Sequence, residues 1–448
     1  MKKVLIANRG EIAVRIIRTL KEMNITSVAV YSSGDKDSLH VALADEAYCI
    51  GGPSSADSYL NIDNILQAAL MSGADAIHPG YGFLSETPEF ARRTEELGKI
   101  FIGPTAETME KMGNKSMARQ TMEKAGVPVI PGSDGIVNSI EEVKTLAANI
   151  TYPVVIKAVS GGGGKGMRFA HSDEDVDKLY AGAKKEAKSS FNDDRLYVEK
   201  YIPKARHIEI QIIGDGHGGA VHLYERDCSI QRNNQKLLEE APATILSEKE
   251  RADITETTRQ AIEQLNYRGA GTIEYLYVPE EKRFYFIEMN TRVQVEHTVS
   301  EEVTGVDIIR AQIDVAFNDD IGFSQNDVQL TGHAIEARIN AEDPASNFMP
   351  SPGKIETLHL GLGRNVRVDT HIYSGYTIPP YYDSMIAKII VTAKDRHSAF
   401  EKLQLVLGET VIEPVKTNLD FQYYLTGHPK VLANDYDIKF IHTENIIE

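Results

Sequence analysis

Short hydrophobic runs alternate with longer amphipathic stretches along the first hundred residues. The runs at 3–7, 27–31, 74–78 and 100–103 predict buried strands, and the helical spacing over 11–23 predicts an amphipathic helix between the first two. Strands that alternate with helices indicate a parallel, doubly wound sheet of the α/β class. The first turn, from Asn8 to Glu11, lacks the glycines of GxGxxG. We therefore expect a domain that is Rossmann-like in shape and has no dinucleotide site.

A second unit follows Pro128 and the turn-rich stretch 131–135. Its hydrophobic runs predict strands at 153–158, 167–170 and 196–200. From about residue 204 the chain is rich in strands, with one helix over 248–265 that begins with the capping box Ser247 to Glu250. This last part indicates an α+β arrangement.

Polar and apolar residues alternate between Glu288 and Glu296, which is the period of an extended strand. The even positions carry Glu288, Asn290, Arg292, Gln294 and Glu296, whereas the odd positions are apolar apart from one threonine. One face of this segment therefore carries two carboxylates, a guanidinium and two amides. Such a face is suited to holding a metal ion and an anion.

A hairpin is predicted by the strand-like runs 272–278 and 284–290 and by the polar loop between them. If Val278 faces Phe284, Glu274 lies opposite Glu288, and two like charges at that spacing are destabilising. A divalent cation would remove the repulsion, and two carboxylates with the Asn290 amide form an all-oxygen site suited to Mg²⁺ or Mn²⁺. The alternative is a shifted register that points one glutamate to water.

Composition narrows the class of protein. A formal charge of −17 over 448 residues argues against non-specific binding to nucleic acid or anionic membranes, although a local basic pocket for phosphates stays open. Two cysteines provide neither a disulfide framework nor a zinc site, which favours a reducing cytoplasm. We find no run long enough for a membrane span or a signal peptide.

The glycine run at 161–164 indicates a phosphate-binding loop. Consecutive glycines let backbone N–H groups approach an oxyanion, and Lys157 and Lys115 lie on the flanks. The Walker pattern does not fit, and a flexible linker is the alternative. Farther along, Glu199 ends a predicted strand, where it either contacts an adenine amino group or is an ordinary strand end.

Several segments, spread nearly from end to end, carry a family resemblance. They are 6–12 (IANRGEI), 78–86 (HPGYGFLSE), 161–166 (GGGGKG), 225–229 (ERDCS), 240–242 (EAP), 288–297 (EMNTRVQVEH), 334–342 (AIEARINAE) and 379–384 (PPYYDS). Together they resemble the biotin carboxylases of the ATP-grasp superfamily, a family that includes the biotin carboxylase subunit of bacterial acetyl-CoA carboxylase.

The resemblance implies an ATP-grasp architecture. It places a Rossmann-like N-terminal domain at 1–113, a linker and mobile lid at 114–203 with the lid at about 131–203, and a C-terminal ATP-grasp domain at 204–448. The carboxylase C-terminal region would cover about 331–440 of that last domain.

The resemblance also implies roles for individual residues. The family's metal ligands match Glu274, Glu288 and Asn290, and its bicarbonate pocket matches Lys236, Arg292, Gln294 and Val295. Glu296 matches the base that deprotonates bicarbonate, and Arg338 matches the residue that stabilises the biotin enolate, with Tyr81 and Asp383 as further biotin contacts. The nucleotide contacts match Lys115, Lys157, Gly163, Gly164, Glu199, Lys200, Ile202, His207, Gln231 and Leu276. From the sequence alone, Arg338 could instead form a structural pair with a glutamate.

The implied reaction is the ATP-dependent carboxylation of biotin by bicarbonate through carboxyphosphate, which gives carboxybiotin, ADP and phosphate. Its cofactors are ATP, two Mg²⁺ or Mn²⁺ ions, bicarbonate and biotin on a separate carrier protein, because no Met-Lys-Met attachment motif is present. In acetyl-CoA carboxylase this is the first half-reaction of fatty-acid synthesis, and carboxyltransferase subunits are the further partners. The alternatives are the equivalent component of another acyl-CoA, pyruvate or urea carboxylase, and a non-catalytic nucleotide sensor.

Two expectations concern details. A homodimer is implied by Arg18, Glu22 and Arg367, which match the family's interface region. The family often has histidine at the position of Asn234, so we expect one of the family's nucleotide contacts to be absent here and the affinity for ATP to be altered.

Overall fold

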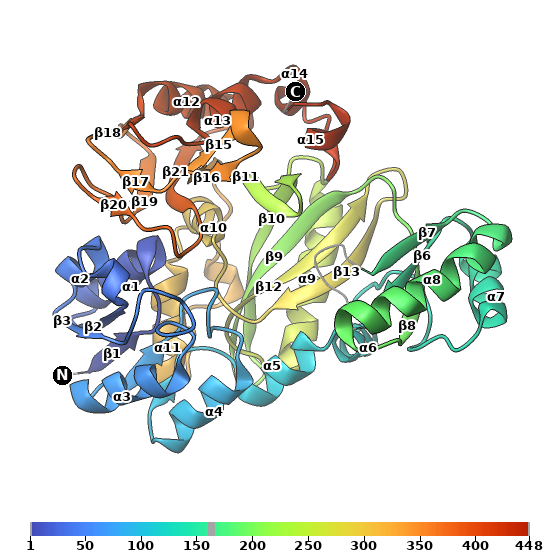
Figure 1. Cartoon of the computed structure of the whole chain (residues 1–448), viewed down its shortest axis with the longest axis horizontal. Helices are drawn as coiled ribbons and strands as arrows, with labels where there is room; N and C mark the ends of the chain where they lie inside the picture. The colour runs from blue at the N-terminus through green and yellow to red at the C-terminus, as the bar shows by residue number, and fades with distance from the viewer. Residues whose placement is uncertain (1, 160–165, 447–448) are drawn as a thin grey trace.

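The computed structural model describes residues 2–159 and 166–446. Figure 1 shows the N-terminal unit on one side, a small protruding unit on the opposite side and a large sheet between them, with the last hundred residues above. Among the described helices, none has the length and apolar composition that crossing a bilayer requires.

The N-terminal unit has the parallel sheet that the sequence predicts. Its strand order is β3-β2-β1-β4-β5, and every pairing is parallel. The strands are β1 (Lys3–Ile6), β2 (Thr26–Tyr31), β3 (Glu46–Cys49), β4 (Ala76–His78) and β5 (Ile100–Phe101), and the helices are α1 (Gly10–Glu22), α2 (Leu39–Leu43), α3 (Ile62–Ser72), α4 (Pro88–Glu96) and α5 (Ala106–Gly113). The first turn therefore leads straight into α1, as expected for a doubly wound fold.

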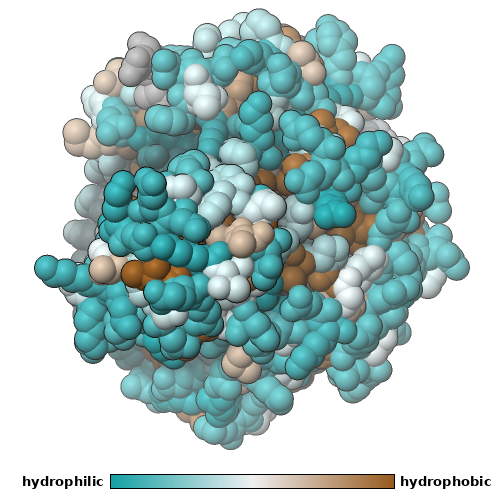
Figure 2. Space-filling view, turned by 90° about the vertical axis from the view of Figure 1, so that its right-hand side faces the viewer, coloured by the Kyte–Doolittle hydropathy of each residue, from teal (hydrophilic) through white to brown (hydrophobic). Residues whose placement is uncertain are grey.

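The protruding unit is a three-stranded antiparallel sheet with two helices packed against it. The strand order is β7-β6-β8, with β6 at Val154–Ala158, β7 at Met167–Ala170 and β8 at Leu196–Lys200. The helices are α7 (Ile140–Ile150) and α8 (Asp173–Phe191), and α6 (Lys115–Lys124) precedes them. The face at the right of Figure 1 is mainly hydrophilic, with small separate apolar patches (Figure 2).

An eight-stranded sheet forms the centre, in the order β13-β12-β9-β10-β11-β14-β21-β19. Its strands are β9 (Arg206–Asp215), β10 (Ala220–Arg232), β11 (Gln235–Ala241), β12 (Arg268–Val278), β13 (Arg283–Asn290), β14 (His333–Asn340), β19 (Val366–Thr370) and β21 (Met385–Ala393). All of these neighbours pair antiparallel.

Helices and short strand pairs complete this part. The helices are α9 (Glu248–Gln264), α10 (His297–Thr304), α11 (Ile308–Asn318), α12 (Arg396–Glu409), α13 (Leu419–Gly427), α14 (Pro429–Leu432) and α15 (Phe440–Thr443). The strand pairs are β15 (Glu342–Asp343) with β16 (Met349–Pro350), β17 (Gly353–Lys354) with β20 (Thr377–Ile378), and β18 (Thr357–His359) with β22 (Val411–Glu413). The predicted capping box at Ser247 is present at the start of α9.

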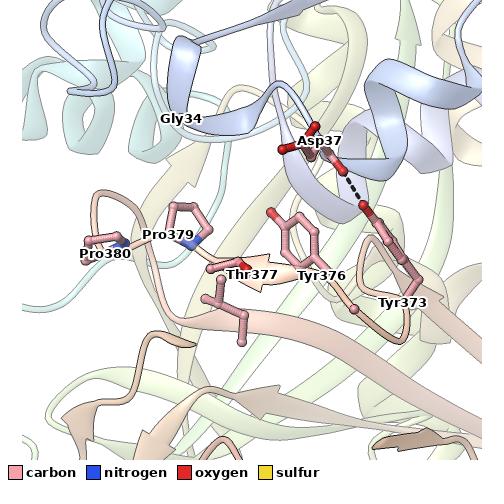
Figure 3. Close-up of a pocket in the computed structure, with 9 residues that line it drawn as sticks. Gly34, Asp37, Tyr373, Tyr376, Thr377, Pro379 and Pro380 are labelled. Carbon is pink, nitrogen blue, oxygen red and sulfur yellow. Dashed lines mark hydrogen bonds between the residues drawn. The ribbon is translucent and has the colours of Figure 1, made fainter. Parts of the chain in front are cut away.

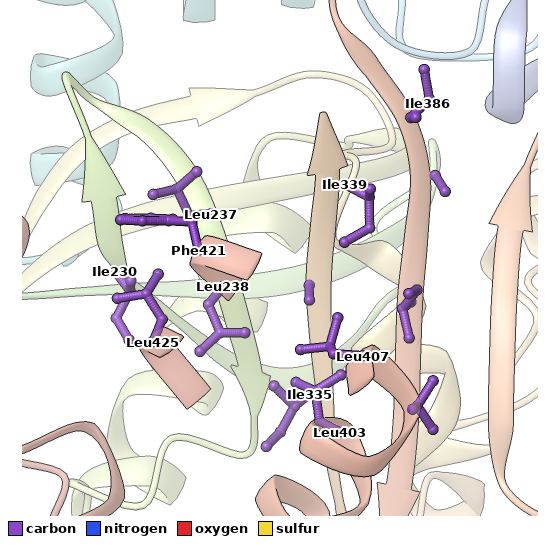
Figure 4. Close-up of a cluster of buried hydrophobic side chains, with 14 of the residues drawn as sticks. Ile230, Leu237, Leu238, Ile335, Ile339, Ile386, Leu403, Leu407, Phe421 and Leu425 are labelled. Atoms are coloured by element: carbon purple, nitrogen blue, oxygen red, sulfur yellow. The ribbon is translucent and has the colours of Figure 1, made fainter. Parts of the chain in front are cut away.

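The largest apolar core lies between α12, α13 and the β11–β14–β21 part of the sheet. Leu403 and Leu407 of α12 and Leu425 of α13 point toward Ile335 and Leu238 on the strands (Figure 4). These side chains are almost fully excluded from solvent. The core therefore fixes the strands that carry the polar residues described below.

Two local expectations need correction. The strand predicted to reach residue 296 ends at Asn290, and Glu296 immediately precedes α10. In the hairpin, Val278 pairs with Arg283, not with Phe284, yet Glu274 does lie opposite Glu288. A β-bulge between Glu274 and Tyr275 accounts for both observations, because one extra residue on β13 shifts the register by one.

Candidate functional site

The ammonium group of Lys236 is the centre of the candidate site. Its Nζ donates hydrogen bonds to Glu209 and Glu296 at 2.5 Å each and to Glu274 at 3.0 Å. These residues come from β11, β9, β12 and the turn before α10, so neighbouring strands bring them together. Burial opposes the charged form, but the three carboxylates outweigh it and raise the pKa of Lys236 well above its ordinary value.

Glu296 is held between two cations. One carboxylate oxygen accepts from Lys236, and the other accepts from Arg338 at 2.9 Å. Burial would raise the pKa of Glu296, but Lys236 and Arg338 hold it below its ordinary value despite the nearby Glu209. The side chain is therefore an ionised carboxylate at neutral pH, the form that a general base requires.

Arg338 extends from β14 between Glu296 and a second buried carboxylate, Glu239. Its Nε donates to Glu239 at 2.5 Å. Burial, together with Glu336 and Glu296, raises the pKa of Glu239 to about 8, although Arg338 opposes the shift. Arg338 thus does form the Arg–Glu pairs of the structural alternative, with Glu239 and with Glu296. Glu296, however, is itself the predicted base.

Gln294 is fixed by a residue that the sequence did not single out. Arg226, on β10, has no exposed surface and donates to Glu209 at 2.5 Å and to the Gln294 Oε1 at 3.0 Å. The Gln294 Nε2 then donates to Glu274 at 2.9 Å. Since Arg226 can only donate, it determines which end of the Gln294 amide faces Glu274.

The predicted metal ligands form a compact oxygen-rich group. Glu274 and Glu288 are opposed across the hairpin, and the Asn290 Nδ2 donates to Glu274 at 2.9 Å. Burial and the charge of Glu274 raise the pKa of Glu288. A like-charge pair of this kind fits a divalent cation, which would stabilise both carboxylates in their ionised form.

A pocket of about 210 Å³ opens beside these ligands. Glu86, Lys115, Glu288 and Asn290 contribute polar groups to its lining. The Lys115 Nζ lies 4.0 Å from a Glu288 oxygen, so a cation and an anion both face the same space. Glu86 was not predicted; it accepts from Arg292 Nε at 2.8 Å.

Arg292 is therefore bonded to a lining residue of this pocket and is not itself part of the lining. Its second contact is to the Asn290 Oδ1 at 3.0 Å. Because the strand ends before it, Arg292 does not share one extended face with Glu296 as the alternation predicted.

The predicted nucleotide contacts fall into two groups. Lys157 donates to Glu199 at 2.5 Å, and Lys200 donates to the Thr151 hydroxyl at 2.6 Å, so both lysines are held on the small sheet. Ile202 and Leu276 pack against one small apolar cluster of Ile130, Val278 and Tyr285, which joins that sheet to the large one. Gly163 and Gly164 lie outside the described residues.

Two further nucleotide candidates lie on the large sheet. The His207 Nε2 is 3.1 Å from Glu274, and although burial opposes protonation, Glu274 and Glu209 raise the pKa of His207 to about 9. Gln231 is half-buried and donates to the Cys228 carbonyl at 2.8 Å.

Asn234 occupies a tight turn. Asn233 and Asn234 have φ values of 51° and 63°, and Arg232 pairs directly with Gln235. Two successive positive φ values in a two-residue hairpin loop define a turn that favours asparagine, whose side chain tolerates the left-handed region. The Asn-Asn sequence therefore has a local structural reason, and the turn leads directly to Lys236.

A larger pocket lies elsewhere in the described part of the chain. It has a volume of about 400 Å³ between the loop at 34–37 and the segment 373–380, where the Tyr373 hydroxyl donates to the Asp37 carbonyl at 2.6 Å (Figure 3). Asp37 is the one charged residue in its lining. A pocket with a carboxylate and no basic group is unsuited to the anions ATP and bicarbonate, so we assign the chemistry to the Lys236 site.

The remaining predicted residues are placed as follows. The Tyr81 hydroxyl donates to Glu11, and the Val295 carbonyl accepts from Lys388 at 2.7 Å. Asp383 is exposed and accepts from its own neighbour Met385. Arg18 and Glu22 are exposed on α1.

Arg367, the third predicted interface residue, is bonded within the chain. It donates to Asp369 and Glu301 at 2.8 Å each. That Arg367 forms a dimer interface together with the exposed residues of α1 stays a prediction.

Comparison with known proteins places this geometry in a family. The biotin carboxylase N-terminal domain matches residues 1–109, the ATP-binding domain of the carbamoyl-phosphate synthase L chain matches 114–322, and the biotin carboxylase C-terminal domain matches 336–443. Biotin carboxylase 1 of Bacillus subtilis is 50% identical over 447 residues, which cover 100% of this chain and 99% of the relative.

Two solved structures are similar along the whole chain. A biotin carboxylase complex from Campylobacter jejuni is 49% identical with a TM-score of 0.91, covering 99% of this chain and 98% of that one. The biotin carboxylase domain dimer of Hydrogenobacter thermophilus 2-oxoglutarate carboxylase, in complex with magnesium ADP, ADP and bicarbonate, is 44% identical with a TM-score of 0.92. This similarity covers 100% of this chain and 98% of that one.

Proposed function

Because the chain belongs to the biotin carboxylase family and is an ATP-dependent biotin carboxylase, we propose that the cluster around Lys236 is where bicarbonate is activated. The observation that carries this proposal is the position of Glu296, whose two oxygens bind Lys236 and Arg338. One carboxylate thus connects the proposed bicarbonate pocket with the residue proposed to face biotin.

Each group near Lys236 has a chemical task in this proposal. Bicarbonate is a weak nucleophile, so Lys236 and the oriented Gln294 hold it while Glu296 removes its proton. Arg292, which is bonded to Glu86 and Asn290 in the lining of the pocket that also contains Lys115, would contact the phosphate that is transferred from ATP to bicarbonate. ATP, bicarbonate and biotin then give ADP, phosphate and carboxybiotin, with carboxyphosphate as the intermediate. Arg338 stabilises the developing negative charge on the biotin ureido oxygen.

The oxygen donors of Glu274, Glu288 and Asn290 would hold Mg²⁺ or Mn²⁺, and the family resemblance implies two such ions. When bound, the metal neutralises charge on the phosphate oxygens. Magnesium, ADP and bicarbonate are the ligands named for the Hydrogenobacter relative, which supports the same set here. We assign the nucleotide to the apolar contact of Ile202 and Leu276, with Lys157, Lys200, Glu199, His207 and Gln231 around it, and to the glycine loop.

We further propose that biotin arrives on a separate carrier protein in the cytoplasm. Tyr81 and Asp383 would contact it, carboxyltransferase subunits would consume the product, and the chain would form a homodimer through the α1 face. Acetyl-CoA carboxylase is the proposed setting. The equivalent component of another biotin-dependent carboxylase uses the same chemistry, and activity with purified carriers of each type distinguishes them.

The test is ADP release by the purified protein with Mg-ATP, with and without bicarbonate and biotin. We expect release to require bicarbonate, to rise when biotin is added, and to fall about 10²–10⁴-fold in Glu296→Gln, which is the range for loss of a general base. The control is Glu225→Gln, which alters an equally buried carboxylate paired with Arg251. ATP binding without any bicarbonate-dependent ADP release would contradict the proposal.

A further inference from the structure

A buried ion pair between Glu11 and Lys388 joins helix α1 to strand β21. The Lys388 Nζ lies 3.4 Å from the Glu11 Oε1, and the two side chains are 0% and 2% exposed. Charged groups this deeply buried are costly unless they are paired, and breaking such a pair costs several kcal/mol. The pair is therefore a fixed element of the structure.

The lysine end of this pair reaches the segment that precedes Glu296. The Lys388 Nζ donates to the Val295 carbonyl at 2.7 Å. That carbonyl belongs to the peptide group linking Val295 to Glu296, so Lys388 restrains the backbone from which the proposed base projects. On the sheet, Lys388 lies directly opposite Arg338 on one side and Asp369 on the other.

The glutamate end reaches the loop after β4. The same Glu11 oxygen that faces Lys388 accepts a hydrogen bond from the Tyr81 hydroxyl. The other oxygen, Oε2, is buried and has no hydrogen-bond partner among the described residues. Rotating the Glu11 carboxylate would therefore disturb Tyr81 and Lys388 together.

We propose that Glu11 and Lys388 form a positioning pair that fixes Tyr81 relative to Val295 and Glu296. In terms of the proposed function, on which this inference rests, the pair sets the distance between the biotin subsite and the bicarbonate subsite. Neither residue touches a reacting atom.

Alignment of the two subsites matters because carboxyphosphate is short-lived. If biotin is displaced, the carboxyl group is lost to water as bicarbonate while ADP and phosphate are still produced. A misplacement of about 1 Å costs on the order of 10²-fold in rate. Loss of the pair should therefore lower the yield of carboxybiotin per ADP more than it lowers ADP release.

The test measures carboxybiotin formed from labelled bicarbonate and ADP released in the same reaction, with free biotin. For Lys388→Met and Glu11→Gln we expect the ratio of carboxybiotin to ADP to fall about 10-fold, with the KM for ATP changed by less than about twofold. In the double variant the loss should be close to that of one single variant, because residues that act as a unit are not additive. Lys388→Arg, which keeps the charge, should recover part of the ratio.

A matched control separates positioning from stability. Arg251 likewise donates to a buried carboxylate, Glu225, at 2.7 Å and to a main-chain carbonyl, that of Ala243, at 3.1 Å. Arg251→Met should lower stability and leave the ratio at the wild-type value.

Several results would overturn the inference. An unchanged ratio in Lys388→Met, with both products reduced equally, would mean that the pair only stabilises the fold. If that variant does not fold, Glu11→Gln decides alone, because glutamine has the same shape and keeps an acceptor for Tyr81. Wild-type protein that makes no carboxybiotin would refute the proposed function instead, which keeps the two failures distinct.

Discussion

Replacing Arg226 by methionine tests whether the buried network behind Lys236 is needed for bicarbonate binding. Arg226 has no exposed surface, and its five hydrogen bonds reach Glu209, Gln211, Ser300, Thr272 and Gln294. Methionine preserves much of the volume but leaves Glu209 with Lys236 at 2.5 Å and the more distant His207 at 3.7 Å as its cationic partners. Breaking a buried ion pair in this way costs about 3–5 kcal/mol in the free energy of unfolding.

The same change releases the amide of Gln294. Without the hydrogen bond that Arg226 donates to its Oε1, the Gln294 amide can flip by 180°. Either its oxygen or its nitrogen can then face Glu274 and the bicarbonate pocket. We expect the KM for bicarbonate to rise about 10-fold or more, whereas the KM for ATP stays near the wild-type value. Bicarbonate-dependent ADP release gives both constants, and urea unfolding followed by tyrosine fluorescence gives the stability, since the chain has 20 tyrosines and no tryptophan.

Arg206→Met is the control. Arg206 is also buried, 2% exposed, and pairs with Asp227 at 2.6 Å, but it contacts neither Gln294 nor Lys236. It should lose similar stability with an unchanged KM for bicarbonate. The reasoning fails if Arg226→Met is within about 1 kcal/mol of wild type in stability, or if both variants change the KM for bicarbonate equally.

Three further predictions follow from individual groups. Burial lowers the pKa of His40 to about 4, so the unfolded chain takes up a proton at this residue first as the pH falls below about 6.5. Between pH 7 and 5 this group alone should cost about 2 kcal/mol of stability, and urea unfolding of His40→Gln should lack that loss. Glu288→Gln removes one of two opposed carboxylates, so we expect the free energy of unfolding without magnesium to rise by about 0.2–1 kcal/mol. We also expect ADP release to depend less on magnesium, and a lower free energy of unfolding would contradict the prediction. Asn234→Val places a branched side chain at φ 63° and should destabilise the hairpin by about 1–2 kcal/mol in unfolding experiments, whereas Asn234→Gly should be close to neutral.

Much of the fold could be predicted because its elements follow local periodicity. The strands at 167–170 and 196–200 were predicted with their observed limits, and the parallel N-terminal sheet is confirmed. The order of the large sheet was not predicted, because pairings such as β11 with β14 join segments about a hundred residues apart that carry no mutual signal in one sequence.

The proximity of candidate site residues was predicted correctly where the pattern was local and was missed where it was not. The opposed Glu274 and Glu288 were found from hairpin length, although the bulge that aligns them was invisible in the sequence. Glu209 was missed, yet the same alternation argument applies to it: His207, Glu209 and Gln211 alternate with isoleucines along β9. Arg226 could not be found in this way, because its role depends on partners from four separate segments.

The sheet also determines how the chain can be divided. The ATP-binding family match ends at residue 322 and the carboxylase C-terminal match begins at 336, but β11 and β14 are hydrogen-bonded neighbours across that boundary. A fragment ending near residue 330 would expose the edge of β11, the strand that carries Lys236, and unpaired edges of this kind promote aggregation. The two matched segments therefore share a single sheet, and we expect neither to be a stable independent unit. Limited proteolysis between them should yield a nicked complex that remains associated.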